Sequence, residues 1–311
     1  METLTRAEKI AVIGAGSVGS TVAYTLLLEN LASEIILIDI NEAREEGEVM
    51  DMHDALPFVE TSNIKRGDLA DAGNADIIII TAGLPQKSGE TRLDLAKKNE
   101  DILRSIANQI PAIKKSAIVI LVTNPVDIMT YVAQEIFDLP ITQVFGTGTG
   151  LDTARLKSEL SETLHADVSD IEGYVLGEHG DSGFIAWSTV KVGGSDIRNI
   201  VTDPAIFAKI ENVVKQEAYN IISKKGATFY GIATVVTDLV QTILRDEKKI
   251  IPVSTRVNNW NGISDVCMGV PAVIYRSGIK ELTNIELEPS EIDKLQKSAA
   301  ILKKYIPSET E

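Results

Sequence analysis

The chain has 311 residues, 44% of them hydrophobic and 24% charged, with a formal net charge of −15. This length favours two domains that share a cleft. The negative charge argues against binding to nucleic acid or to anionic membrane surfaces, because both need a positive field. We expect no signal peptide, and the longest apolar runs are far shorter than the roughly 20 residues that span a bilayer. The single cysteine, Cys267, is expected to be a packed apolar side chain. Because one cysteine allows no disulfide within the chain, which fits a reducing compartment, we expect a cytoplasmic protein.

The first predicted unit is a strand, a glycine-rich turn and a helix. The apolar run 9–13 ends at Gly14-Ala15-Gly16-Ser17-Val18-Gly19, and apolar residues then recur at helical spacing. A second apolar run, 35–38, ends in Asp39, about 20 residues after the last glycine. The three glycines permit, in order, a tight turn, close approach of the backbone to a pyrophosphate, and close packing of helix on strand. Because the carboxylate of Asp39 would bind ribose hydroxyls and repel a 2′-phosphate, the pattern predicts NAD rather than NADP.

Two further apolar strands are predicted at 77–81 and 118–122, with a helix at 93–110 between them and a short strand at 144–145 afterwards. This alternation predicts a Rossmann-type, doubly wound parallel sheet covered by helices on both faces. Ligands bind such sheets at the C-terminal ends of the strands. We therefore expect a cofactor site formed by Gly14, Gly16, Ser17, Val18, Gly19, Asp39, Thr81, Ala82, Gly83, Asn99, Val122 and Asn124.

Two candidate substrate contacts lie in the same half. The amide of Asn124 can reach a nicotinamide or a substrate oxygen, although it can also be a simple turn residue before proline. The polar segment 84–92 predicts a mobile loop that closes over the substrate and excludes water. Its side chains of interest are Gln86, near the tip, and Arg92, at the junction with the next helix. Taken alone, each would more simply be a solvated loop residue.

The alternation stops after residue 146, which divides the chain into a cofactor domain, 1–146, and an α+β substrate domain, 147–311. A helix beginning near residue 151 carries Asp152 and Arg155 on one face, a pair that in isolation would be a surface ion pair of little energetic value. His179, one of three histidines, lies in a glycine-bracketed turn.

Three more helices are predicted in the second half. The first spans residues 204–224, and the second spans 227–244 with Thr228 in its first turn. The last is at the C-terminus, with Ser290 as its N-cap.

Taken together, these segments resemble the L-lactate/malate dehydrogenase family, from residue 9 to about residue 306. Five motifs in matching order and spacing carry the resemblance: Gly14-Ala15-Gly16-Ser17-Val18-Gly19, Gln86-Lys87-Ser88-Gly89-Glu90-Thr91-Arg92, Thr123-Asn124-Pro125-Val126-Asp127, Leu151-Asp152-Thr153-Ala154-Arg155 and Gly177-Glu178-His179-Gly180-Asp181. The resemblance implies an NAD-dependent dehydrogenase of a small 2-hydroxy acid, active in glycolysis and fermentation. It also implies a homo-oligomer, either a dimer or a tetramer.

The resemblance implies a role for each matching side chain. His179 would donate and accept the proton, and Asp152 would orient it. Arg155 would hold the substrate carboxylate, Arg92 would polarise the carbonyl when the loop closes, and Thr228 would line the pocket. These residue types suit the chemistry, because histidine titrates near neutral pH and guanidinium binds a carboxylate through two parallel hydrogen bonds.

Gln86 would occupy the position that selects the oxo acid. Malate-type members carry arginine there, and a neutral amide would leave the second carboxylate of oxaloacetate unpaired, so lactate and pyruvate are favoured. Lys87 complicates this interpretation. Thr147 and the run 184–189 resemble instead the branch that acts on bulkier substrates such as 2-hydroxyisocaproate, so this acid and malate remain alternatives. An alternative of another class is a noncatalytic NAD-binding sensor.

A regulatory expectation also follows from the resemblance. Bacterial members activated by fructose 1,6-bisphosphate carry an arginine and a histidine where this chain has Lys157 and Glu172. Because Glu172 would repel a phosphate, we expect weak or absent activation.

Overall fold

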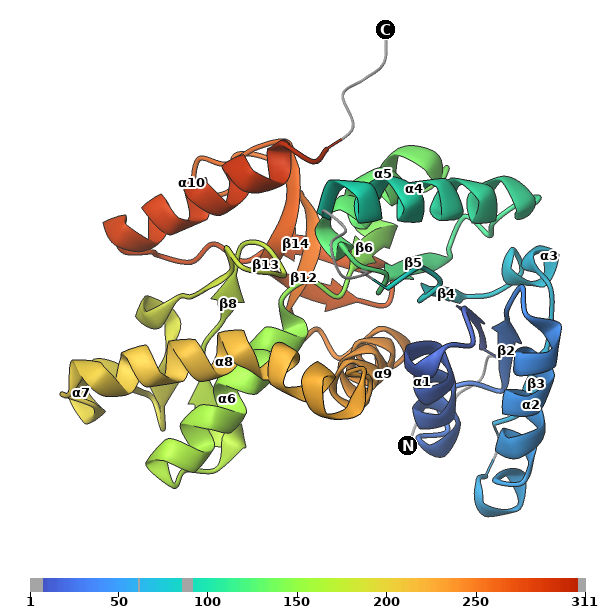
Figure 1. Cartoon of the computed structure of the whole chain (residues 1–311), viewed down its shortest axis with the longest axis horizontal. Helices are drawn as coiled ribbons and strands as arrows, with labels where there is room; N and C mark the ends of the chain where they lie inside the picture. The colour runs from blue at the N-terminus through green and yellow to red at the C-terminus, as the bar shows by residue number, and fades with distance from the viewer. Residues whose placement is uncertain (1–7, 61, 86–91, 307–311) are drawn as a thin grey trace, which may run out of the picture.

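The computed structural model describes residues 8–60, 62–85 and 92–306. A nine-stranded sheet in the order β14-β13-β12-β6-β5-β4-β1-β2-β3 organises them, and it confirms the predicted doubly wound α/β fold (Figure 1). The six parallel strands are β1 (Lys9–Ile13), β2 (Glu34–Ile38), β3 (Ile64–Arg66), β4 (Ile77–Ile80), β5 (Ile118–Leu121) and β6 (Val144–Gly146). Three antiparallel strands follow: β12 (Ile250–Val257), β13 (Val266–Tyr275) and β14 (Gly278–Leu282).

The sheet continues past the point where the sequence alternation ends. Ser254 of β12 pairs with Gly146 of β6, so strands from the second half of the chain extend the sheet of the first half. The C-terminal end of β6 is thereby held against β12. This junction positions the helix that follows β6, which carries Asp152 and Arg155.

Helices cover both faces of the parallel strands because side chains alternate between the faces. In β1, Ile10 and Val12 pack with helices α1 and α9, whereas Ala11 and Ile13 pack with α4 and α5. Figure 1 shows α4 and α5 at the top of the molecule and α1 and α9 below the strands. The helices of this half are α1 (Ser17–Leu28), α2 (Glu42–His53), α3 (Leu69–Ala72), α4 (Arg92–Gln109) and α5 (Val126–Ile136), with 3₁₀ turns η1 (Leu56–Phe58) and η2 (Ile141–Gln143).

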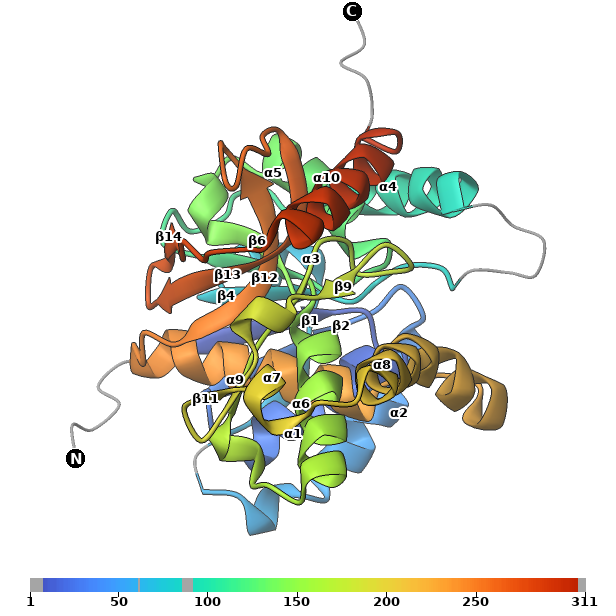
Figure 2. The ribbon, with the colours of Figure 1, turned by 90° about the vertical axis from the view of Figure 1, so that its left-hand side faces the viewer.

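The second half builds a separate small core around Leu156, Leu160, Ile210 and Val214, where α6 meets α8. In the view of Figure 2, α10 lies at the top, and α6 and α8 lie lower down. The helices here are α6 (Gly150–Leu164), α7 (Ile197–Ile200), α8 (Pro204–Lys225), α9 (Tyr230–Arg245) and α10 (Pro289–Lys303), with η3 (Val168–Asp170) and η4 (Trp187–Thr189). Short strands complete it: β7 (Ile171–Glu172), β8 (Val175–Leu176), β9 (Phe184–Ile185), β10 (Lys191–Val192) and β11 (Ser195–Asp196).

Two predicted helix starts are wrong. The helix expected from residue 227 begins at Tyr230, so Thr228 lies in the connection after α8 rather than in a first turn. Gly226, in the left-handed conformation with φ 87°, ends α8, and the chain needs the next three residues to change direction. The N-cap of α10 is Glu288 and not Ser290, because Pro289 takes the first helical position and Glu288 forms a reciprocal capping box with Glu291.

Two expectations from composition can be compared with the structure. Cys267 lies buried in β13, as predicted, and burial raises the pKa of its thiol. Across residues 8–60, 62–85 and 92–306, no helix combines the length and the apolar character needed to cross a membrane.

Candidate functional site

The glycine-rich turn between β1 and α1 is shaped by its neighbours. Gly14 has φ +108°, and a Cβ there would lie 2.7 Å from the backbone nitrogen of Ala82. A Cβ at Gly19 would collide with the carbonyl oxygen of Gly14. At Gly16, by contrast, a Cβ would meet none of the described atoms within 4 Å. Gly14 and Gly19 are therefore required by packing, whereas Gly16 opens onto free space.

That free space suits an anion. Gly16 is the N-cap of α1, and neither a capping side chain nor an acidic residue is found in the first turn of this helix. The first N–H groups of α1 are thus available to a phosphate, and the helix dipole favours negative charge. Val18 is partly buried, and Ser17 is exposed beside the turn.

Asp39 lies next to the same turn at the end of β2. Its Oδ2 accepts a hydrogen bond from the Ala15 N–H (2.6 Å), and its Oδ1 accepts one from the Asn41 N–H (2.8 Å). Each carboxylate oxygen keeps capacity for a further hydrogen bond. The carboxylate is therefore held in a fixed position beside the turn, where a ribose hydroxyl could donate to it.

The segments after β4 and β5 form the neighbouring wall. Thr81 Oγ1 donates to the Gly14 carbonyl oxygen (3.0 Å), which ties β4 to the glycine-rich turn. Asn99 is 1% exposed. Its Oδ1 accepts the Leu84 N–H at 2.8 Å, and its Nδ2 donates to the Asn124 carbonyl oxygen at 2.7 Å. Asn99 therefore holds the two wall segments together. Within this wall, Ala82 and Val122 are partly buried, and Gly83 and Asn124 are exposed.

His179, Asp152 and Arg155 meet at the carboxyl end of the sheet. Asp152 and Arg155 come from the first turns of α6, and His179 comes from the turn after β8. His179 Nδ1 and Asp152 Oδ2 are 2.6 Å apart, and Arg155 Nη1 donates to Asp152 Oδ1 at 3.3 Å. Asp152 and Arg155 are thus part of a buried cluster rather than an isolated surface pair, and the Arg155 side chain is only 6% exposed.

A fourth residue, Asp127, holds the histidine from the other side. This carboxylate in the first turn of α5 is 1% exposed. Its Oδ2 accepts the backbone N–H of His179 (2.8 Å), and its Oδ1 accepts the hydroxyl of Ser254 (2.6 Å). Asp127 stood in one of the five motifs, but no role was predicted for it. The sequence could have indicated this role, because Asp127 is a carboxylate in an otherwise apolar first turn of a helix that closely follows the end of a strand.

The charges in this cluster support one another. Burial acts to lower the pKa of His179, but the negative charges of Asp152 and Asp127 and the hydrogen bond that the imidazole donates to Asp152 outweigh it, so the pKa is raised. Burial acts to raise the pKa of Asp152, but His179 and Arg155 outweigh it, so that pKa is lowered. Burial dominates at Asp127 and raises its pKa to about 6. An imidazolium paired with the Asp152 carboxylate is therefore favoured near neutral pH.

The turn that carries His179 is anchored on two sides. Gly177 and Gly269 of β13 exchange backbone hydrogen bonds of 3.1 and 2.7 Å. The N–H of the buried Glu178 donates to Ser298 Oγ of α10 at 2.8 Å, and Ser182 Oγ donates to the Glu178 carboxylate. The position of the histidine is thus fixed by β13 and α10 as well as by its two carboxylate neighbours.

Other predicted site residues are not placed in this cluster. Gln86 and Lys87 lie outside the described residues, and of Arg92 only its backbone position, at the start of α4, is described. Thr228 is partly buried between α8 and α9, and no hydrogen bond among the described residues links it to His179.

Two sites lie at the carboxyl edge of the sheet: the glycine-rich turn with Asp39, and the cluster of His179, Asp152 and Arg155. Together with the sheet topology, they are those of an NAD-dependent dehydrogenase. The signature of the NAD-binding domain of lactate/malate dehydrogenases matches residues 8–146, and that of the family's α/β C-terminal domain matches residues 149–311. The chain therefore belongs to the lactate/malate dehydrogenase family.

Individual relatives agree along nearly the whole length. The chain is 45% identical to an L-lactate dehydrogenase of Clostridium botulinum over 308 residues, covering 95% of each chain. It is 44% identical to an L-lactate dehydrogenase of Acetivibrio thermocellus over 305 residues, covering 96% of each. A crystal structure of a lactate dehydrogenase from a Medee basin deep-sea metagenome library has a TM-score of 0.92 at 36% identity, covering 97% of this chain and 98% of that one. The minor L-lactate dehydrogenase of Enterococcus mundtii has a TM-score of 0.93 at 36% identity, covering 96% and 97%.

Proposed function

We propose that the protein interconverts L-lactate and pyruvate with NAD(H). The observation that carries the proposal is the partly buried His179–Asp152 contact of 2.6 Å with the buried Arg155 beside it, at the carboxyl edge of an NAD-binding sheet. The relatives named above as L-lactate dehydrogenases support the choice of substrate. A noncatalytic NAD-binding sensor would not need a histidine paired in this way with a carboxylate.

The residues fit the cofactor. We assign the pyrophosphate to the N-terminus of α1 above Gly16, and the ribose hydroxyls to the Asp39 carboxylate. Thr81, Asn99 and Asn124 would maintain the wall on which the nicotinamide end rests. When bound, the reduced cofactor supplies a hydride to the substrate carbonyl carbon.

The protein's own groups supply the rest of the chemistry. Because Asp152 engages His179 Nδ1, the proton on Nε2 is the one passed to the carbonyl oxygen as pyruvate becomes lactate, and it returns to Nε2 in the reverse direction. The raised pKa of His179 keeps this proton in place near neutral pH. The planar guanidinium of Arg155 binds the substrate carboxylate and so selects the carbonyl face. Arg92 would polarise the carbonyl, Gln86 would select the oxo acid and Thr228 would line the pocket, as the resemblance implies.

The decisive experiment compares kcat/KM with NADH for pyruvate, 2-oxoisocaproate and oxaloacetate in one buffer. We expect pyruvate to lead by about tenfold or more, which corresponds to about 1.4 kcal/mol of transition-state discrimination. A lead for 2-oxoisocaproate or oxaloacetate would assign the chain to another branch of the family. For a sensor, no 2-oxo acid would consume NADH. As a control, His179→Ala should abolish turnover while NADH binding, followed by fluorescence, is retained.

Organisation and location complete the proposal. We assign residues 1–146 to the cofactor domain and 147–311 to the substrate domain, and we place the protein in the cytoplasm. We also infer a homo-oligomer, because the exposed apolar residues Phe58 and Tyr230 line a surface cavity of about 590 Å³ between α1, α2 and α9. Light scattering should give twice or four times the 33.7 kDa of the chain.

A further inference from the structure

The buried guanidinium of Arg155 lies between two carboxylates. Asp152, on the same helix, accepts a hydrogen bond from Nη1 at 3.3 Å. Glu217, on α8, places Oε2 3.9 Å from Nε, which is within ion-pair distance but too long for a hydrogen bond. Helix α8 packs directly on α6, as Figure 1 shows, so this second carboxylate belongs to the fixed surroundings of the arginine.

The proposed reaction needs only one of these carboxylates. Asp152 is neutralised by His179 and orients it, whereas Glu217 has no part in proton transfer. A guanidinium can bind a carboxylate through the edge formed by Nε and one terminal nitrogen. Because Nη1 is turned to Asp152, Nε belongs to the edge left for the substrate carboxylate. The Glu217 carboxylate lies beside this same Nε.

The helix that carries Glu217 is anchored beside the catalytic turn. Lys215 Nζ donates to the Asp181 carbonyl oxygen at 2.7 Å, and Tyr219 OH donates to Asp181 Oδ1 at 3.0 Å. These two residues flank Glu217 in the sequence and join α8 to the turn that carries His179. Although the Glu217 side chain is 40% exposed, its helix is therefore held over Arg155.

We infer that Glu217 is a specificity-determining residue, a resident carboxylate that opposes the substrate carboxylate at Arg155. This inference rests on the proposed function, in which Arg155 receives the carboxylate of a 2-oxo acid. Glu217 weakens the binding of every anionic substrate, and it weakens a dianion such as oxaloacetate more than a monoanion such as pyruvate. It thus selects for monocarboxylic 2-oxo acids, separately from any side chain on the loop.

The size of the effect follows from Coulomb's law. Two carboxylates on one guanidinium are about 5 Å apart, and at an effective dielectric constant of about 40, suited to a partly exposed group, their repulsion corresponds to about tenfold in affinity. Salt screens such a group, so about five- to tenfold is expected at low ionic strength and less at high ionic strength.

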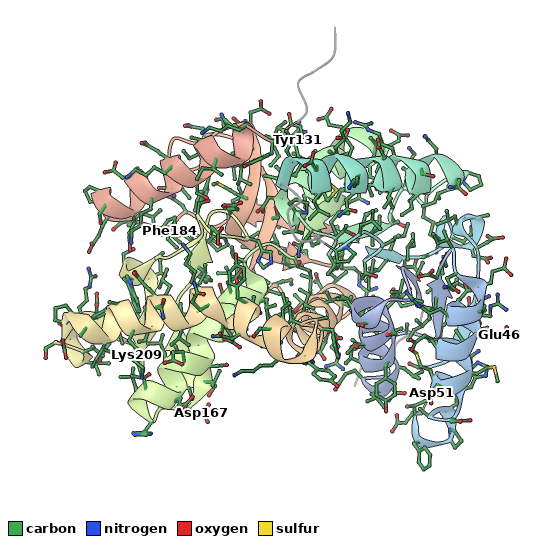
Figure 3. All side chains as sticks on the ribbon, viewed as in Figure 1. Glu46, Asp51, Tyr131, Asp167, Phe184 and Lys209 are labelled. Atoms are coloured by element: carbon green, nitrogen blue, oxygen red, sulfur yellow. The ribbon has the colours of Figure 1, made fainter. Side chains whose placement is uncertain are left out.

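The test is Glu217→Gln in the full-length enzyme, which removes the charge and keeps the shape. With saturating NADH, we expect the KM for pyruvate to fall about five- to tenfold with a smaller change in kcat, and the KM for oxaloacetate to fall further. Both differences should shrink as salt is added. The matched control is Glu46→Gln on α2, which removes one surface charge far from α8 (Figure 3) and should leave both KM values unchanged.

Calorimetric titration of oxamate into the NADH complex separates this inference from the proposed function. Oxamate carries the carboxylate of pyruvate, but its amide carbonyl is a poor hydride acceptor. Tighter oxamate binding by Glu217→Gln supports the inference even if the wild type reduces no 2-oxo acid, a result that would defeat the proposed function alone. Unchanged pyruvate KM and oxamate affinity in Glu217→Gln, or equal changes in Glu46→Gln, would overturn the inference.

Discussion

The substitution Asp127→Asn separates the charge of this buried carboxylate from its hydrogen bonds. Asparagine Oδ1 can still accept the His179 N–H, and its NH2 group can donate to Ser254 Oγ, because a hydroxyl rotates to accept as readily as it donates. Both contacts, 2.8 and 2.6 Å in the wild type, are therefore expected to persist. What is lost is a negative charge in a 1% exposed position.

The expected stability change depends on pH. Burial raises the pKa of Asp127 from 3.8 to about 6, so the folded protein holds this proton more tightly than the unfolded chain does. The carboxyl group then contributes most to stability below pH 3.8 and loses about 3 kcal/mol of that contribution as pH rises through about 6. An amide does not titrate. The stability of Asp127→Asn relative to wild type should therefore improve by about 2.4 kcal/mol between pH 4 and pH 7.

Chemical denaturation at several pH values measures this difference, and the pH profile of pyruvate reduction provides a second measurement. Because the negative charge of Asp127 helps to raise the pKa of His179, its removal should move the alkaline decline of pyruvate reduction to lower pH. A stability difference between the two proteins that is the same at pH 4 and pH 7 would refute the reasoning. Asp127→Ala, which leaves the His179 N–H without its acceptor, should be less stable than Asp127→Asn at both pH values.

Three further predictions concern the other parts of the site. Asp152→Asn removes the largest influence that raises the pKa of His179, so steady-state pyruvate reduction at pH 7 should fall about 10²- to 10⁴-fold, and its alkaline limb should move to lower pH. Arg155→Lys should raise the pyruvate KM about 10- to 100-fold, with NADH binding by fluorescence unaffected, because ammonium cannot form two parallel hydrogen bonds. Gly16→Ala should keep the wild-type Tm but weaken NADH binding about tenfold, whereas Gly19→Ala should lower the Tm, because only the second Cβ meets protein atoms.

The strand β3 was not predicted, because only its first residue, Ile64, is apolar. The other five parallel strands could be predicted from the sequence to within one residue at each end. Each is a short apolar run with polar or glycine residues at its limits, and a strand buried on both faces has no other composition available. The antiparallel strands were not predicted, because β12 contains Pro252, Ser254 and Arg256 and does not read as an apolar run. Its place is decided by pairing with β6 and β13 over a long sequence separation, which local pattern does not encode.

The candidate site likewise contains residues that the sequence could indicate and contacts that it could not. Asp39, Asp152 and His179 belong to motifs whose residue types suggest their chemistry before the fold is known. The bonds of Asp127 to His179 and Ser254, and the contact of Glu217 with Arg155, join segments that only the tertiary structure brings together. The bonds of Asn99 to Leu84 and Asn124 likewise join segments that are separate in the sequence.

The surroundings of Arg155 explain why such residues matter to function. An arginine that binds a substrate carboxylate must be desolvated to bind strongly, yet a buried guanidinium without counter-charges is costly to fold. Asp152 and Glu217 stabilise it in the absence of substrate, and the negative charge of Asp152 serves a second purpose by raising the pKa of His179. Glu217 has no such second use, so its charge acts against the incoming carboxylate. The strength of substrate binding is therefore set jointly by α6, which presents the arginine, and by α8, which opposes the substrate there.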